Sequence, residues 1–266
     1  MSQKFAGKIA LVTGGNSGIG LAAALAFAKE GARIVITGRD QATLDKAAAQ
    51  LGDKVIAVRS DAGSVADGIK LATLLQQQGV MLDAVFINAG VAKLAPFEAV
   101  REEMWDATFN TNLKGPYFLI KALLPRLNPG AAIVLNGSIN AHIGMPNTSV
   151  YAASKAALIS LAKTLSSELL SRGVRVNVVS PGPVTTPLLS RLGLPAEQLS
   201  EVAAGIQAQV PLKRFGTPGE IASAVLYLAS SDFGVHRWHG AGGRRWHEPA
   251  LIVTNDSSNL TKAGRT

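Results

Sequence analysis

The chain has 266 residues, of which 47% are hydrophobic and 17% charged, and this size suits one α/β domain with a large buried core. The absence of cysteine excludes disulfides and thiolate metal sites. Neither a signal peptide nor the roughly 18-residue apolar run of a membrane span is present, so we expect a cytoplasmic protein with no membrane partner. From Arg237 onward, five Lys and Arg residues against two acids contribute +3 of the net charge of +8. The remaining +5 is more typical of solubility or of an anionic cofactor than of nucleic-acid binding.

Short β-branched runs alternate with longer amphipathic segments along the chain. This order predicts a parallel sheet with helices on both faces, an α/β fold of the Rossmann-type doubly wound class. Strands are expected at 8–13, 33–37, 54–59, 84–88, 131–136 and 174–180, and helices at 18–30, 41–50, 64–78, 101–127, 150–172 and 218–229. Residues 1–234 are therefore expected to form one domain, and the Pro- and Leu-rich stretch 183–218, with a helical pattern near 196–208, is a candidate lid.

The first strand runs into the turn "TGGNSGIG", which places glycines at positions 14, 18 and 20 before the first helix. Positions without side chains let such a turn close and let its backbone approach a pyrophosphate, whose charge lies at the helix N-terminus. A glycine trio alone also fits an ordinary tight turn, but here strand, turn, helix and second strand follow one another within about 30 residues. This order indicates a dinucleotide site.

The end of the second strand distinguishes between dinucleotides. Gly38 stands where an NAD-selective protein would place an acid for the ribose 2′-hydroxyl, and the Arg39 that follows can pair with a 2′-phosphate. NADP(H) is therefore favoured, with NAD(H) as the alternative if Arg39 is merely exposed. Asn16 in the glycine turn supplies no second cation for a phosphate.

Three further residues have the chemistry of proton transfer. "YAASK" puts Tyr151 and Lys155 four residues apart, hence on one face of an expected helix. The nearby ammonium favours the phenolate and brings the tyrosine pKa closer to neutral. Ser138 ends the fifth strand, where a hydroxyl would point into the crevice at the carboxyl edge of the sheet. Taken singly, the three also fit a helix anchor, a solvated cation and a turn residue.

Together these motifs resemble those of the classical short-chain dehydrogenase/reductase family. Besides the two motifs quoted, the chain contains "NAG" at 88–90, "NLKG" at 112–115, a serine thirteen residues before Tyr151 and "PGPVTT" at 181–186, and the ordered match covers residues 6–232. The resemblance implies hydride transfer between a nicotinamide and a carbon bearing oxygen, and therefore an oxidoreductase that interconverts a carbonyl and an alcohol. It also implies a small-molecule substrate and a homo-oligomer, either a dimer or a tetramer.

The resemblance assigns roles to a catalytic set of four residues. Tyr151 is similar to the family's general acid/base, and Ser138 to the group that holds the substrate oxygen. Lys155 resembles the residue that binds the nicotinamide ribose and lowers the tyrosine pKa. Asn112 matches the asparagine that anchors a water in the proton relay.

Cofactor contacts follow from the same resemblance. Asp61 is similar to the aspartate at the adenine, and Val184 and Thr186 are similar to the contacts to the carboxamide and the diphosphate. The whole implied set comprises Gly14, Asn16, Ser17, Gly18, Ile19, Gly20, Arg39, Asp61, Asn88, Ala89, Gly90, Tyr151, Lys155, Pro181, Gly182, Val184 and Thr186. No metal site is expected.

The substrate crevice is expected to be lined mostly by apolar side chains from 139–150 and 188–211, namely His142, Met145, Leu188, Leu189, Leu192 and Leu194. Such a lining admits a hydrophobic ketone, an acyl β-keto group or a sugar, and the sequence does not name the substrate. The alternative function is a non-catalytic NADP(H)-sensing binding protein, against which the complete catalytic set argues.

From residue 235 the chain departs from the family pattern, in which the last helix is followed by a strand of the form T-G-x-x-L-x-V-D-G-G. The chain instead has "VHRWHGAGGRRWHEP". Reading the back-translated codons one base later turns both Trp-His junctions, at 238/239 and 246/247, into obligatory glycines with the family's spacing, and the Leu251/Ile252 junction then permits a stop codon. We therefore expect residues 235–266 to be an aberrant, out-of-frame tail and the seventh strand to be atypical or missing.

Two other interpretations of the tail stay open, a basic surface extension and a replacement strand formed by "ALIVT" at 250–254. The three histidines of the tail have no companion acidic residues and do not predict a metal site. Because one of the family's subunit interfaces uses the seventh strand, both a dimer and a tetramer stay open.

Overall fold

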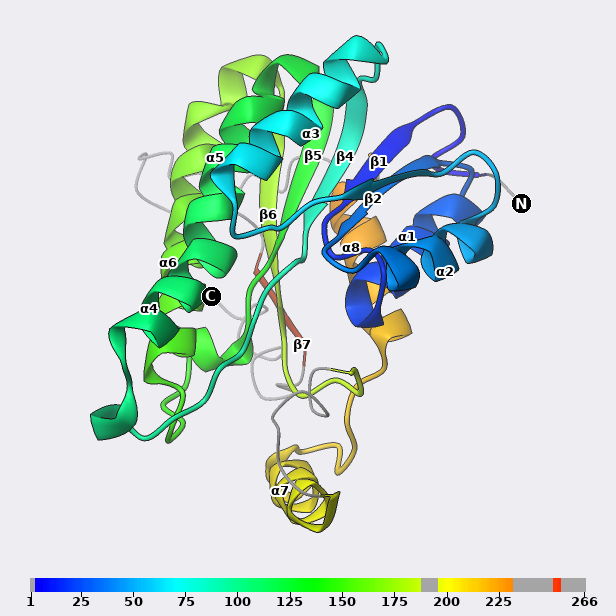
Figure 1. Ribbon diagram of the computed structural model, residues 1–266. Helices are drawn as coiled ribbons and strands as arrows, with labels where there is room; N and C mark the ends of the chain where they lie inside the picture. The colour runs from blue at the N-terminus through cyan, green and yellow to red at the C-terminus, as the bar shows by residue number, and fades with distance from the viewer. Residues whose placement is uncertain (1–2, 188–195, 232–250, 255–266) are drawn as a thin grey trace, which may run out of the picture.

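The strands form a single seven-stranded parallel sheet (Figure 1) in the computed structural model, which describes residues 3–187, 196–231 and 251–254. The strands are β1 (Ile9–Val12), β2 (Arg33–Gly38), β3 (Ile56–Arg59), β4 (Leu82–Ile87), β5 (Leu127–Asn136), β6 (Arg175–Pro181) and β7 (Leu251–Thr254). Their order in the sheet is β3-β2-β1-β4-β5-β6-β7. The direction of winding reverses between β1 and β4, and this doubly wound order opens a crevice at the carboxyl ends of the central strands.

The helices form a layer on each face of the sheet, as the sequence predicts. They are α1 (Gly18–Lys29), α2 (Gln41–Leu51), α3 (Val65–Gln77), α4 (Glu102–Phe109), α5 (Gly115–Leu123), α6 (Ser149–Glu168), α7 (Ala196–Gln209) and α8 (Pro218–Ala229). Helices α3, α5 and α6 cover one face and α1, α2 and α8 the other, whereas α7 lies beyond the ends of the strands and belongs to neither layer (Figure 1). No helix in the described parts of the chain is long and apolar enough to cross a bilayer.

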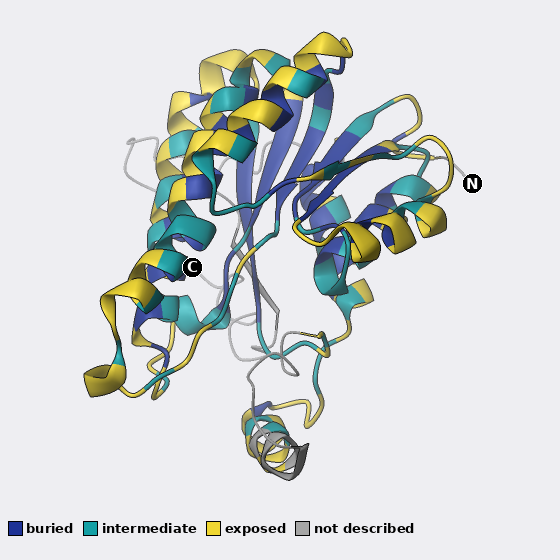
Figure 2. Ribbon diagram, viewed as in Figure 1, coloured by how far each residue is buried: buried dark blue, intermediate teal, exposed yellow. Residues whose placement is uncertain are grey.

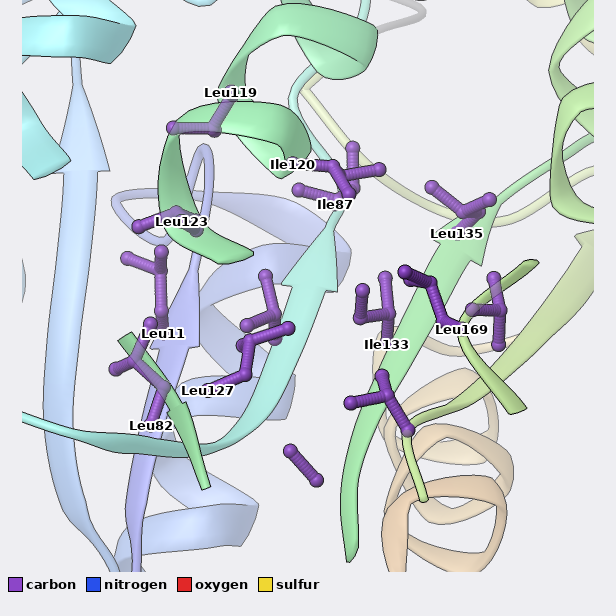
Figure 3. Close-up of a cluster of buried hydrophobic side chains, with 14 of the residues drawn as sticks. Leu11, Leu82, Ile87, Leu119, Ile120, Leu123, Leu127, Ile133, Leu135 and Leu169 are labelled. Carbon is purple, nitrogen blue, oxygen red and sulfur yellow. The ribbon is translucent and has the colours of Figure 1, made fainter. Parts of the chain in front are cut away.

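Two hydrophobic cores hold the helix layers to the sheet, because successive strand residues point to opposite faces. Leu11 packs into the cluster that includes Leu71 of α3 and Leu119 of α5 (Figure 3), and its neighbour Val12 packs into the cluster with Ile221 of α8. The central strands are buried along most of their length, and exposed residues lie on the outward faces of the helices (Figure 2). Apolar side chains on both faces of the sheet therefore fix the helices and strands relative to one another.

The sequence predicts one continuous helix at 101–127, but in the structure this segment is interrupted and its helical part ends before residue 127. The structure has α4, a π turn (Asn110–Lys114), α5 and a 3₁₀ turn (Leu124–Arg126), and β5 already begins at Leu127. Two prolines, Pro116 and Pro125, lie at the starts of α5 and of the 3₁₀ turn. Because proline lacks the N–H that an α-helix needs, the helical hydrogen-bond pattern changes at both places.

The seventh position in the sheet is filled by β7, which pairs with β6 from Val178↔Leu251 to Pro181↔Thr254. This four-residue strand comes from the "ALIVT" segment, so the sheet has an atypical seventh strand in place of the family pattern. The rest of the tail, 235–250 and 255–266, lies outside the described residues.

Candidate active site

The glycine turn joins β1 to α1 at the central crevice. Gly14 has a left-handed φ of +62°, and a Cβ on Gly20 would collide with the carbonyl oxygen of Gly14, so both positions require glycine. Ser17 has an extended backbone and precedes Gly18, the first residue of α1. The N–H groups of the first helical turn have no intrahelical partners, and here they lie at the carboxyl end of β1, which fits a pyrophosphate.

Asn88, directly after β4, holds the next loop beside this turn. Its main-chain N–H donates to Thr13 Oγ1 at 2.9 Å, and its Nδ2 donates to the carbonyl oxygens of Thr13 at 3.0 Å and Gly14 at 3.4 Å. The Ala89 N–H donates to the same threonine hydroxyl at 3.0 Å. Thr13 is only 2% exposed and was not singled out by the sequence motifs, although a hydroxyl residue directly after the first strand is the available signal.

Ser138 and Tyr151 meet at the carboxyl end of β5. Ser138 lies two residues beyond the strand, Tyr151 lies in the first turn of α6, and their side chains are hydrogen-bonded. Burial of the hydroxyl raises the pKa of Tyr151 above its ordinary value of 10.0, and the hydrogen bond with Ser138 offsets part of the rise. The lowered pKa expected from the Tyr-Lys spacing is therefore not found, because desolvation dominates and the Lys155 Nζ lies 5.9 Å from the centroid of the tyrosine ring.

Lys155 follows one turn along α6 and is 4% exposed. Its Nζ donates to the main-chain carbonyl of Asn136 at 2.7 Å, and Asn136 Nδ2 donates to Asn88 Oδ1 at 3.0 Å. These bonds connect the lysine to the glycine turn through two asparagines, of which the sequence motifs missed Asn136. Burial lowers the pKa of Lys155 from 10.5 to about 8.

Asn112 lies in the π turn (Asn110–Lys114) between α4 and α5, a type of turn that is frequent at functional sites. Both the oxygen and the nitrogen of its side-chain amide form hydrogen bonds. Oδ1 accepts from the Val91 N–H at 2.9 Å, and Nδ2 donates to the Val91 carbonyl at 2.9 Å and to Ser154 Oγ at 3.0 Å. The side chain thus fastens the loop after β4 to α6.

Arg39 and Asp61 come together at the ends of β2 and β3. With Arg59 and Asp67 they line a cavity of about 320 Å³. The Asp61 carboxylate accepts from the Gly63 N–H at 2.9 Å, and the Asp61 N–H donates to Asp67 Oδ2 at 3.0 Å. The cavity has the mixed charge suited to an adenosine that carries a phosphate. Neither Arg59 nor Asp67 was singled out from the sequence.

The loop after β6 lies against the start of α1. Val184 forms a bridge with Gly216, and the Thr185 N–H donates to the Gly216 carbonyl at 2.9 Å. A Cβ on Gly18 would lie 3.4 Å from the Thr186 side chain, which is ordinary contact distance. Thr186 therefore stands where a diphosphate at the helix N-terminus would pass.

The structure describes only some of the residues that are expected to line the substrate crevice. His142 follows the short 3₁₀ turn (Ile139–Ala141) and is exposed, so nothing fixes it toward the crevice. The four expected leucines at 188, 189, 192 and 194 lie outside the described residues. Within the described ranges, no group of three His, Asp or Glu side chains gathers as a candidate metal site.

The chain is similar to known oxidoreductases. The family model described as Enoyl-(Acyl carrier protein) reductase matches residues 14–236. A protein named Oxidoreductase asL5 from Sarocladium schorii is 40% identical over 233 residues, which cover 86% of this chain and 91% of that protein.

Solved structures are similar over nearly the whole chain. The crystal structure of a short-chain dehydrogenase/reductase, glucose/ribitol dehydrogenase, from Brucella melitensis matches with a TM-score of 0.83 and 33% identity over 96% of this chain and 98% of that one. A blue fluorescent protein from a metagenomic library, solved in complex with NADPH, matches with a TM-score of 0.82 and 28% identity over 95% of this chain and 98% of that one.

Proposed function

The chain belongs to the short-chain dehydrogenase/reductase family, whose members are NAD(P)-dependent oxidoreductases, and on this premise we propose that it reduces a carbonyl to an alcohol with NADPH and with Tyr151 as the proton donor. The observation that carries the proposal is the convergence of Ser138, Tyr151 and Lys155 at the carboxyl end of β5. A cofactor-binding protein without catalysis would not require a hydrogen-bonded tyrosine and serine beside a buried lysine.

Tyr151 is the proposed proton donor. Because burial raises the pKa of Tyr151, its hydroxyl keeps its proton at neutral pH and is ready to donate it to a carbonyl oxygen. The Ser138 hydroxyl is positioned to hold the same oxygen, and the bound nicotinamide supplies the hydride. The ammonium of Lys155 is positioned to bind the nicotinamide ribose, and its bond to Asn136 fixes its orientation.

Preference for NADP(H) is supported by charge and by space at the end of β2. A Cβ on Gly38 would lie 2.7 Å from Cγ of Asn16, so the place of an NAD-selective acid is already filled by the asparagine side chain. The exposed Arg39 lies next to it on the cavity that also contains Asp61. One solved relative was crystallised in complex with NADPH, which agrees with this preference.

Assembly into a homo-oligomer is proposed through the outer face of α4, α5 and α6. Trp105 and Tyr117 are each 46% exposed, and a hollow of about 400 Å³ is lined by Leu113, Tyr117, Phe118 and Leu161, among others. Large exposed aromatic surfaces of this kind usually mark a protein contact. We propose that a second copy of the chain covers this face, so that a dimer forms without the seventh strand.

We further propose that residues 1–234 are the catalytic domain and that 235–266 are translated out of frame. The family match ends at residue 236, close to the point where the strand pattern is lost. The strand β7 at Leu251–Thr254 replaces the family strand in the sheet but has neither of its glycines.

Oxidation of NADPH with a panel of ketones, keto-acyl thioesters and sugars tests the proposed activity. Ketones are included because the sequence predicts an apolar lining of the crevice. Keto-acyl thioesters are included because the family description names the acyl carrier protein, and sugars because one similar solved structure is named glucose/ribitol dehydrogenase. Turnover with at least one class is the expected result, and absence of turnover with all of them would contradict the proposal.

A further inference from the structure

A second arginine lies at the adenosine end of the crevice, outside every motif of the sequence. Arg59 is the last residue of β3, and it lines the same cavity as Arg39. Its Nε donates to the Arg39 carbonyl oxygen at 3.1 Å, so one donor holds the side chain over the turn that follows β2. The Nη groups, which carry four further N–H donors, extend beyond this bond.

Strand register places Arg59 directly opposite the position that selects the cofactor. In the β2–β3 pair, Gly38 and Arg59 are partners. Paired residues of neighbouring parallel strands point to the same face of the sheet, so the arginine side chain leaves β3 on the face where the missing Cβ of Gly38 makes room for Asn16. Arg59 is thus on the side of the sheet where the ribose 2′ position is expected.

The charges in this cavity leave both arginines available to an anion. The two acids turn toward main-chain N–H groups, Asp61 toward Gly63 and Asp67 toward Asp61. Among the described residues neither Arg39 nor Arg59 forms an ion pair within 4 Å.

Asp40 is the acid on which the charge of Arg59 acts through space. The Asp40 carboxylate accepts from the Thr43 N–H at 2.8 Å, and this bond, with a smaller contribution from the charge of Arg59, lowers the pKa of Asp40. The Asp40 carboxylate is committed to capping α2.

We propose that Arg59 is the second cation of the 2′-phosphate site and that it binds this phosphate together with Arg39, from the neighbouring strand end. The inference rests on the proposed use of NADP(H) and adds to it a specificity-determining residue. Two guanidinium groups that converge from adjacent strands provide several charge-assisted donors to one phosphate, whereas the 2′-hydroxyl of NAD(H) gains little from a second cation. The cation that the glycine turn lacks at Asn16 is thus supplied by β3.

The test measures the dissociation constants of two ligands, 2′,5′-ADP and 5′-AMP, which share the adenosine but differ in the 2′-phosphate. Both constants are measured for the wild type and for the variants Arg59→Gln, Arg59→Lys and Arg33→Gln. Arg33 is an exposed arginine at the opposite end of β2, so Arg33→Gln is a control for the loss of one positive charge. Because Arg59 is exposed and solvent screens its charge, we expect Arg59→Gln to weaken 2′,5′-ADP binding about tenfold. Binding of 5′-AMP should not change, Arg59→Lys should recover part of the loss, and Arg33→Gln should bind both ligands like the wild type.

Two results would overturn the inference and are distinguishable. If the wild type binds 2′,5′-ADP no more tightly than 5′-AMP, the proposed NADP(H) preference fails, and the role of Arg59 fails with it. If the wild type prefers 2′,5′-ADP but Arg59→Gln keeps that preference, or weakens both ligands equally, only the role of Arg59 is wrong.

Discussion

The ammonium of Lys155 donates a 2.7 Å hydrogen bond to the main-chain carbonyl of Asn136, the last residue of β5. The lysine is thereby fixed in a buried position where its charge is costly, and its pKa falls to about 8. A group that titrates near pH 8 makes cofactor binding dependent on pH, because only the ammonium form binds a ribose hydroxyl with a charge-assisted bond.

The first prediction concerns this pH dependence. Affinity for NADPH should be constant near pH 7 and should fall severalfold between pH 7 and pH 9.5 as Lys155 loses its proton. A titration followed by the fluorescence of NADPH measures it, with Lys155→Met as the control, whose weaker binding should not vary over the same range. A wild-type affinity that is equal at both pH values would contradict the assigned pKa.

The same shift has a definite sign for stability. Between pH 8 and pH 10.5 the unfolded chain holds more protons at this lysine than the folded chain does. The free energy of unfolding therefore increases as the pH rises through this window, and the folded state becomes more stable.

The second prediction concerns Gly38 and Asn16. Gly38→Asp alone should weaken NADPH binding at least tenfold, because the new carboxylate repels the 2′-phosphate, yet it should improve NADH binding little, because its Cβ would lie 2.7 Å from Cγ of Asn16. Adding Asn16→Ala removes the obstacle, and the double variant should bind NADH more tightly than either single variant. Additive effects of the two substitutions on NADH affinity would argue against this packing.

The third prediction concerns the start of α8. Thr217 Oγ1 accepts from the Glu220 N–H at 3.3 Å, and the Glu220 carboxylate accepts from the Thr217 N–H at 2.7 Å, so the helix has a reciprocal capping box. Thr217→Ala should lower the free energy of unfolding by about 1 kcal/mol in urea denaturation. Thr73→Ala, on the exposed side of α3, is the control and should stay within about 0.5 kcal/mol of the wild type.

The capping box should also survive mild acid. The ion pair with Arg214, followed by the bonds from Thr217, lowers the pKa of Glu220 to about 2. Its stabilising contribution is present above the ordinary value of 4.5 and is lost as the pH falls from there towards 2. The contribution of the Glu220 carboxylate to the free energy of unfolding should therefore be constant above about pH 4.5 and should fall between pH 4.5 and pH 2, which urea denaturation at a series of pH values measures.

The fourth prediction concerns the tail. Independent sequencing of the coding DNA should find a single-base difference near codon 235, after which the corrected frame encodes glycines at the two Trp-His junctions and ends near residue 251. An uninterrupted frame through Thr266 in independent clones would contradict the out-of-frame origin.

The sequence predicts the sheet, both helix layers and the order of the site residues, because each depends on local periodicity or on motifs at fixed spacing. It misses the interruption of the 101–127 helix because the apolar pattern continues through the π turn and Pro116, whereas the hydrogen-bond pattern does not, and it misses the earlier end of the helix at the 3₁₀ turn that contains Pro125. The helical pattern predicted near 196–208 agrees with α7 at Ala196–Gln209.

Contacts between distant segments could not be predicted in the same way. Thr13 binds Asn88 across 75 residues, and Lys155 binds Asn136 across 19, and no local pattern encodes either bond. The pKa of Tyr151 shows the same limit, since spacing indicates the nearby lysine but not the burial that dominates. Arg59 was missed because its partner, Gly38, is adjacent only through strand pairing.

The central claim, that Tyr151 transfers the proton in an NADPH-dependent reduction, is tested most directly by comparing the wild type with Tyr151→Phe on the best substrate of the panel. Phenylalanine keeps the ring and removes only the hydroxyl, so the account predicts a fall in kcat of at least about 100-fold with NADPH affinity unchanged. A Tyr151→Phe variant that turns over at the wild-type rate would contradict the account.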